Sequence, residues 1–364
     1  MLIGIDASRA AIPRRTGTEA YAYHLIRALL PLAHEHGHQV KLYYNQPPAQ
    51  PISTTLHEAV NLPFPRLWTH VRLAAELHRH SPDVFFTPAH VIPYSYCGKS
   101  IATIHDLGYH YFPEAHTSRQ VRQLTWSTQH NANRSRMILA DSLATKRDLV
   151  TYYGIRPKKI TVIYPSYDTT LTPTVNQDKL GIPPPYFLFL STLQPRKNVS
   201  RIIEAFAQVA PNIPHQLVLA GKAGWLADTI MTTLAAQSPA VQERIHLTGF
   251  VADADKAALL SGATALVYPS LFEGFGFPVL EAQACGTAVI TAKNSSLPEV
   301  AGDAARMVSA ESTAEIAQAM QQLANDAIYR QQLIEKGFAN IKRFSWETAA
   351  QQTLAILEQV DHEK

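Results

Sequence analysis

Residues 268–286 read YPSLFEGFGFPVLEAQACG and carry the clearest structural signal in the chain. An apolar strand is expected to end at Tyr268, and a glycine-rich loop follows it. Pro278 then falls at the start of a helix, where its missing N–H costs nothing, and Gly286 suits the C-terminal cap of that helix. A strand, a glycine loop and a helix in this order leave backbone N–H groups open at a helix N-terminus, which predicts a phosphate site.

Two carboxylates lie in this stretch. Glu273 is in the loop, and Glu281, eight residues later, is expected in the first turn of the helix. The helix dipole stabilises a carboxylate at such a position, but a carboxylate is poorly suited to bind phosphate. Both side chains are suited to accept hydrogen bonds from sugar hydroxyls.

Outside this stretch, short β-branched or aromatic runs alternate with amphipathic stretches. This alternation predicts parallel sheets with helices on both faces, and 364 residues at about 150 per domain predict two domains. Residues 164–185 contain five prolines and no clean periodicity, which indicates a linker. Strands are expected at Leu2–Ile5, Val40–Tyr44, Val84–Thr87, Ile101–Ile104, Met137–Ala140, Ile160–Ile163, Phe187–Leu190, Gln216–Ala220, Ile245–Thr248, Ala265–Tyr268 and Ala288–Thr291.

Composition excludes several classes of protein. The chain is 46% hydrophobic and 17% charged, and its apolar runs are shorter than the ~20 residues of a membrane span. Two cysteines make neither a disulfide framework nor a zinc site, and a net charge of +3 is too small to suggest nucleic acid. Residues 1–170 hold 18 Lys/Arg against 11 Asp/Glu, and 171–364 hold 14 against 18. The basic half suits an anionic acceptor or membrane surface, although an ordinary solvated surface explains it equally well.

The motif EGFGFPVLE, residues 273–281, resembles the E-x7-E signature of retaining GT-B glycosyltransferases of family 4. Residues 187–206, FLFLSTLQPRKNVSRIIEAF, and 284–305 are similar to the same family. So are TIHDL at residues 103–107 and the loop at residues 16–18. The resemblance covers most of the chain, in the order of the family.

This resemblance implies an α/β GT-B fold, with two Rossmann-like domains that face each other across an interdomain cleft. Residues 1–170 would form the N-terminal, acceptor-binding domain, and residues 171–342 the C-terminal, nucleotide-sugar-binding domain. Residues 343–364 would form a C-terminal helix that packs back toward the N-terminal domain.

The resemblance also implies roles for individual residues. Arg196 and Lys197 would neutralise the donor diphosphate, and cations there are also the physical expectation because negative charge develops on the leaving nucleotide. Glu281 would hold the ribose. The implied catalytic residues are His105, near the anomeric centre, Arg196, Lys197 and Glu273, which holds the transferred sugar; the implied donor-binding residues are Gly17, Gly274, Phe275, Gly276, Phe277, Val279, Leu280 and Glu281.

Four further features need interpretation. The first loop has one glycine, Gly17, where the family often has two, and Arg14 and Arg15 beside it offer an alternative contact for an acceptor phosphate. The D-x-D string at residues 253–255 is interpreted as a helix start, with Asp253 as N-cap. Residues 34–38, HEHGH, lack the H-E-x-x-H spacing of a metal site and are interpreted as a helix end. The basic helix expected at Pro65–His80 suits a membrane surface, but packing on its own sheet is favoured.

The predicted function is transfer of a hexose from a nucleoside diphosphate sugar to a hydroxyl acceptor, with retention and without a metal or other cofactor. GDP-mannose is the first expected donor and a UDP-sugar the second. A lipid-linked acceptor is left open, within polysaccharide or glycolipid assembly. The expected location is cytoplasmic, with at most peripheral membrane contact. The alternatives are a nucleotide-sugar epimerase of the same architecture and a non-catalytic nucleotide-sugar-binding protein.

Overall fold

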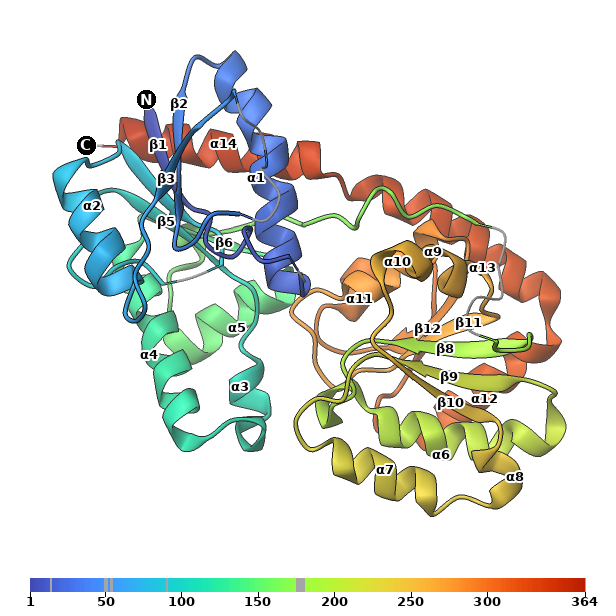
Figure 1. Ribbon diagram of the computed structural model, residues 1–364. Coiled ribbons are helices and arrows are strands. Elements are labelled where there is room, and N and C mark those ends of the chain that lie inside the picture. Colours follow the sequence, from blue (N-terminus) through green and yellow to red (C-terminus); the bar gives the residue numbers. More distant parts are fainter. Residues whose placement is uncertain (14, 49–51, 53–54, 90, 175–180, 364) are drawn as a thin grey trace. The chain divides into compact units, whose positions relative to one another are not determined.

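The computed structural model describes residues 1–363 except 14, 49–51, 53–54, 90 and 175–180, so the predicted linker lies partly outside the described residues. The chain divides into two compact units. Unit 1 comprises Met1–Ser166 and Phe344–Lys364, and unit 2 comprises Tyr167–Arg343. Each unit is a parallel sheet with helices on both faces (Figure 1).

The sheet of unit 1 has the strand order β3-β2-β1-β4-β5-β6-β7. The strands span Leu2–Asp6 (β1), Gln39–Tyr44 (β2), Glu58–Asn61 (β3), Val84–Thr87 (β4), Ser100–Ile104 (β5), Met137–Ala140 (β6) and Ile160–Val162 (β7). The helices span Gly17–Glu35 (α1), Ala74–Arg79 (α2), Gly108–Tyr111 (α3), Ser118–Arg134 (α4), Leu143–Tyr153 (α5) and Trp346–His362 (α14). The C-terminal helix α14 packs along α1 within this unit (Figure 1).

The sheet of unit 2 has the order β10-β9-β8-β11-β12-β13. The strands span Tyr186–Leu190 (β8), Gln216–Ala220 (β9), Ile245–Gly249 (β10), Ala265–Tyr268 (β11), Ala288–Ala292 (β12) and Arg306–Val308 (β13). The helices span Val199–Val209 (α6), Ala227–Ala235 (α7), Pro239–Gln242 (α8), Asp253–Ser261 (α9), Phe277–Ala284 (α10), Leu297–Ala301 (α11), Thr313–Asn325 (α12) and Ala327–Asn340 (α13). In both sheets the strand order reverses once, which creates the switch point where α/β folds bind ligands.

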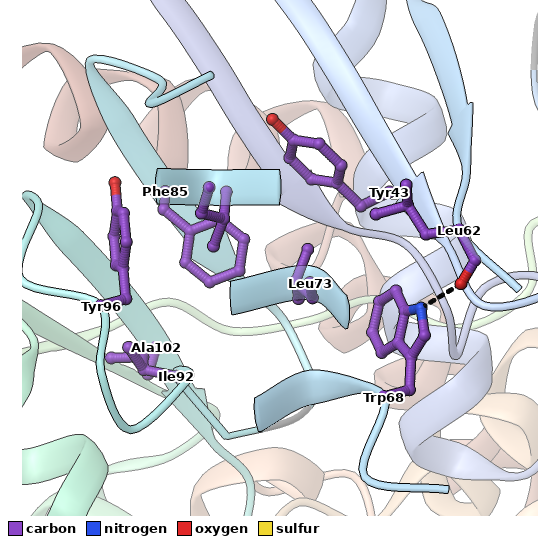
Figure 2. Close-up of a cluster of buried hydrophobic side chains, with 9 residues drawn as sticks. Tyr43, Leu62, Trp68, Leu73, Phe85, Ile92, Tyr96 and Ala102 are labelled. Atoms are coloured by element: carbon purple, nitrogen blue, oxygen red, sulfur yellow. Dashed lines mark hydrogen bonds between the residues drawn. The ribbon is translucent and has the colours of Figure 1, made fainter. Parts of the chain in front are cut away.

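The helix expected at Pro65–His80 starts later than predicted. Leu67 has a φ of +55°, which a helix does not accept, so a wide π turn begins at Thr69 and leads into α2. Trp68 is buried in an apolar cluster on the sheet and donates its indole N–H to the carbonyl of Leu62 at 2.7 Å (Figure 2). The favoured packing of this segment on its own sheet is therefore confirmed.

The structure changes two details of the sequence interpretation, concerning two strands and one helix cap. The strands β3 and β13 were not predicted; β3 is largely exposed and therefore has no apolar run. Asp253 is the first residue of α9, with Ala252 in the cap position, so its assignment as N-cap is wrong by one residue.

Cys97 and Cys285 are both free. Among the described residues, no helix combines the length and apolarity that a membrane span requires.

Candidate functional site

The switch point of unit 2 lies between β8 and β11, which are neighbours in the sheet although other elements separate them in sequence. Arg196 and Lys197 follow β8, and Glu273 follows β11. Because the strands are parallel, their carboxyl ends lie at the same edge of the sheet. The topology thus brings together charged groups that are more than 70 residues apart.

Lys197 is the centre of this group. Its Nζ lies 2.6 Å from Glu273 Oε1 and 2.6 Å from the hydroxyl oxygen of Tyr268. The side chains of Lys197 and Glu273 are only 9% and 7% exposed. A buried ion pair of this kind is maintained only when its remaining hydrogen bonds are also satisfied.

Asn198 fixes the turn that presents these cations. Residues 195–197 form one turn of 3-10 helix, and Asn198 ends it with a φ of +64°. Its side-chain amide donates to the carbonyls of Pro269 at 2.9 Å and Ala310 at 2.6 Å. The backbone N–H of Leu271 donates to the carbonyl of Arg196 at 2.9 Å. The turn is therefore joined directly to the loop that carries Glu273.

Two cations, Arg196 and Lys197, face the carboxylate of Glu273. Burial raises the pKa of Glu273, but Lys197 and Arg196 more than offset it, so that the net pKa lies below its usual range and the group is ionised. Arg196 Nη1 lies 3.7 Å from Glu273 Oε2 and donates to the carbonyl of Phe272 at 3.0 Å. Two cations against one carboxylate suit the recognition of an added anion such as a diphosphate.

The glycine loop is held in place by the turn before α11. Ser296 Oγ donates to the carbonyls of Glu273 at 2.9 Å and Phe275 at 2.7 Å, and the N–H of Glu273 donates to Ser295 Oγ at 3.1 Å. Gly276 has a φ of +116°, and a Cβ there would lie 2.9 Å from a methyl of Leu297. The loop conformation thus requires glycine at this position.

The start of α10 differs from the sequence expectation. The helix begins at Phe277, so Pro278 is its second residue and Glu281 lies beyond the first turn. The predicted position of Glu281 in the first turn is therefore wrong. The N–H of Val279 donates to the carbonyl of Gly276 at 3.0 Å, so it is already hydrogen-bonded before any phosphate is present.

Glu281 belongs to a second ion pair, which is partly buried. Lys256 Nζ on α9 donates to Glu281 Oε1 at 2.6 Å, and Glu281 is 8% exposed. Burial lowers the pKa of Lys256, but the charge of Glu281 more than offsets this, so its pKa lies above the usual value. Sequence reasoning missed Lys256 because it lies on a different helix and no motif connects the two residues.

In unit 1, His105 follows β5 and uses both of its ring nitrogens. Nδ1 lies 2.6 Å from Asp141 Oδ2, and Nε2 lies 2.9 Å from the carbonyl oxygen of Pro88. Both ring nitrogens face oxygen atoms, and an imidazolium beside an ionised Asp141 satisfies both contacts as a donor. Burial raises the pKa of Asp141, and the charge of His105 offsets this only in part. The predicted contact of His105 with a sugar through the ring would require one of these bonds to break. Asp141 was not predicted from the sequence.

The charge on His105 gives a pH-dependent prediction. Burial lowers its pKa, but Asp141 more than offsets this, so the pKa lies above the usual value. A raised native pKa contributes stability below about pH 6.5, and this is lost as the pH rises through the native pKa. We expect Asp141→Asn to lower the pKa of His105 in an NMR titration and to flatten the pH dependence of urea unfolding. Asp148→Asn, which removes a carboxylate bonded to Tyr111, should leave the His105 titration unchanged; an unchanged pKa in Asp141→Asn would contradict the assignment.

Gly17 is exposed and is the first residue of α1. The carboxylate of Glu19 accepts hydrogen bonds from the backbone N–H of Thr16, at 3.1 Å, and from its hydroxyl. Arg9 Nη1 lies 3.2 Å from the other oxygen of Glu19. The T-x-x-E spacing of Thr16 and Glu19 is that of a capping box. The role of Glu19 could therefore have been predicted from the sequence.

The structure describes only one of the two arginines, Arg14 and Arg15, that were considered as contacts for an acceptor phosphate. Arg14 lies outside the described residues. The guanidinium carbon of Arg15 lies 3.6 Å from the centre of the Tyr23 ring, which is a cation–π contact.

Comparison with known proteins gives the family. The family described as "Glycosyl transferases group 1" matches residues 174–339, and the one described as "Glycosyltransferase Family 4" matches residues 15–171. The chain belongs to these glycosyltransferases. The predicted family and its α/β GT-B fold are confirmed, and the chain is a transferase enzyme.

One relative and two solved structures are informative. The chain is 27% identical over 332 residues to the "O-antigen chain mannosyltransferase B" of Escherichia coli, which covers 88% of this chain and 83% of the relative. A sucrose-phosphate synthase from Thermosynechococcus elongatus has a TM-score of 0.78 at 18% identity and covers 99% of both chains. Anabaena Alr3699/HepE, solved in complex with UDP-glucose, has a TM-score of 0.75 at 19% identity and covers 98% of this chain and 99% of that one.

Proposed function

We propose that this glycosyltransferase moves mannose from GDP-mannose to a hydroxyl of a saccharide acceptor during assembly of a polysaccharide or glycolipid. The proposal depends mainly on one observation: two cations, Arg196 and Lys197, lie together at the switch point of unit 2. A nucleoside diphosphate is the ligand class that needs such a charge at this edge of a Rossmann-like sheet.

The two glutamates have separate roles in this proposal. Glu273, held ionised by Lys197, accepts hydrogen bonds from hydroxyls of the transferred sugar. Glu281, oriented by Lys256, accepts them from the ribose. Unit 2 binds the donor, and unit 1 binds the acceptor. The resemblance that assigns these roles also implies the contributions of His105 and Gly17 to the sugar site.

The donor assignment is supported by sequence. The Escherichia coli relative described above is named a mannosyltransferase, which favours a mannosyl donor. The Anabaena structure was solved in complex with UDP-glucose, but its likeness to this chain is one of fold alone. We therefore rank a UDP-sugar as the second candidate donor. We propose cytoplasmic action with at most peripheral membrane contact.

Retention is proposed from the family resemblance and from the state of Glu273. A carboxylate that acts as a nucleophile must be free to attack the anomeric carbon, whereas Glu273 is held by Lys197. We therefore propose a front-side displacement in which a donor phosphate oxygen helps to deprotonate the acceptor. The positive charge that a metal would supply to the diphosphate comes here from Arg196 and Lys197.

The first experiment measures nucleotide release from a panel of GDP-, UDP- and ADP-sugars, with and without saccharide acceptors. We expect release from GDP-mannose that requires an acceptor and falls at least about a hundredfold in Glu273→Gln, which removes a charge from the sugar site. Lys336→Ala is the matched control, because Lys336 forms an exposed ion pair with Asp303 on the surface of unit 2; it should keep full activity.

Other outcomes separate the alternatives. Release from a UDP-sugar alone would replace the donor and retain the reaction class. Conversion of the sugar without an acceptor would identify an epimerase. Tight donor binding without turnover over the whole acceptor panel would identify a binding protein, and failure to bind any donor would overturn the proposed function.

A further inference from the structure

Three side chains of types that can bind metal ions lie close together in unit 1. None of them has a role in the proposed reaction. His36 caps the C-terminal end of α1, His38 lies just before β2, and Glu358 is on α14. His36 Nδ1 lies 2.9 Å from Glu358 Oε1, and His38 Nε2 lies 2.8 Å from the same oxygen. The three ligand atoms all lie within 4.8 Å of one another.

The local backbone explains why the two rings converge. Gly37 separates the histidines and has a φ of +74°, with nothing within 4 Å of a built Cβ. This left-handed residue ends α1 and reverses the chain into β2, so that the residues on both sides of it reach the same carboxylate. Packing of α14 along α1 supplies that carboxylate from 320 residues away in sequence.

We propose that His36, His38 and Glu358 form a binding site for a divalent transition metal such as Zn²⁺, which ties α14 to the end of α1. Two imidazoles and one carboxylate are a donor set that Zn²⁺ accepts, with a fourth position left for water. The His36 side chain is 53% exposed, which gives an ion access from solvent. The role of such a site is structural, because none of its ligands belongs to the proposed donor site.

Zinc binding requires the three ligand atoms to adjust. Zinc bonds of about 2.0–2.1 Å in tetrahedral geometry place ligand atoms about 3.3 Å apart. The two N···O distances must therefore lengthen by roughly half an ångström, which the 30% exposed side chain of Glu358 allows. The two ring nitrogens, which lie within 4.8 Å of each other, must come to the same spacing. One oxygen of Glu358 is already shared by the two imidazoles, so a single ion can reach all three ligands. The other ring nitrogen of His38 lies 3.4 Å from the Met1 amine.

The test uses the full-length, tag-free protein after treatment with a chelator. Titration with ZnCl₂, followed by calorimetry, should show one equivalent bound per chain, with the release of protons that metal binding to such ligands causes. Thermal unfolding should shift upward by roughly 5 °C at a hundredfold excess of zinc over the dissociation constant. Co²⁺ bound at the same site should give visible absorption bands that are typical of a Co²⁺ ion with a low coordination number.

Three variants decide the assignment. Glu358→Gln keeps the shape of the side chain, and we expect it and His36→Ala to weaken zinc binding more than about tenfold and to abolish the thermal shift. His34→Ala removes an exposed imidazole from the same segment but not from the cluster, and it should behave as wild type. The proposal would be overturned if the wild-type protein did not bind zinc, or if both cluster variants still bound it. It would also be overturned if His34→Ala lost zinc binding to the same extent as the cluster variants.

Discussion

Lys197→Met is expected to lower kcat by roughly 10²–10³ under conditions that saturate the donor. The substitution removes the buried cation nearest to Glu273 and with it part of the positive charge that meets the departing nucleotide. It also leaves the carboxylate of Glu273 buried without its main partner, which should lower the free energy of unfolding by about 3 kcal/mol. Steady-state kinetics and urea unfolding of the same preparation measure the two effects separately.

A double variant distinguishes the catalytic role of Lys197 from a structural one. Lys197→Met combined with Glu273→Gln removes both charges, and buried ion pairs replaced as a unit are often neutral for stability. We therefore expect the double variant to recover most of the lost stability but to be less active than Glu273→Gln alone, because it also lacks a cation at the diphosphate. Activity equal to that of Glu273→Gln alone would show that Lys197 acts only by holding Glu273, and would argue against its role at the diphosphate.

Gly221→Ala is expected to be a strongly destabilising substitution in unit 2. Gly221 follows β9 with a φ of +145°, and a built Cβ would lie 1.8 Å from the carbonyl oxygen of Ser191 at the end of β8. Its N–H donates to the carbonyl of Gly249 at 2.8 Å, so the backbone cannot move away without breaking that bond. We expect a loss of more than about 4 kcal/mol in the free energy of unfolding and a melting temperature lower by on the order of 10 °C.

Gly249→Ala is the matched control for this prediction. Gly249 also has a positive φ, +68°, but a built Cβ meets nothing within 4 Å. Its cost should be confined to the left-handed backbone, about 1–2 kcal/mol. Similar losses in the two variants would mean that backbone strain, rather than the close approach of Ser191, decides the requirement for glycine at residue 221.

Sequence periodicity predicted most of the fold because buried parallel strands are nearly continuous apolar runs. The expected strands at Val84–Thr87, Met137–Ala140, Gln216–Ala220 and Ala265–Tyr268 match the structure residue for residue. The edge strand β3 escaped prediction for the converse reason: its exposed face removes the apolar run. The late start of the helix after Leu67 could not be predicted either, because no sequence pattern indicates a positive φ at a leucine.

The candidate site was predicted unevenly for a related reason. A motif within one strand–loop–helix segment, such as residues 268–286, specifies its own local geometry. It does not specify which cation, from a loop more than 70 residues away, will contact Glu273. The sequence placed Arg196 and Lys197 in the donor site by resemblance, but the direct Lys197–Glu273 pair, Tyr268 beside it and the Lys256–Glu281 pair required the structure.

The sequence by itself determined the two α/β sheets, the glycine loop before α10 and the glycosyltransferase family, because each depends on residues that are close together in the chain. Tertiary structure decided the raised pKa of His105, through Asp141 at the end of the neighbouring strand. It also decided the meeting of His36 and His38 with Glu358. These features depend on distances between segments that are remote in sequence, and only the packing of strands and helices sets those distances.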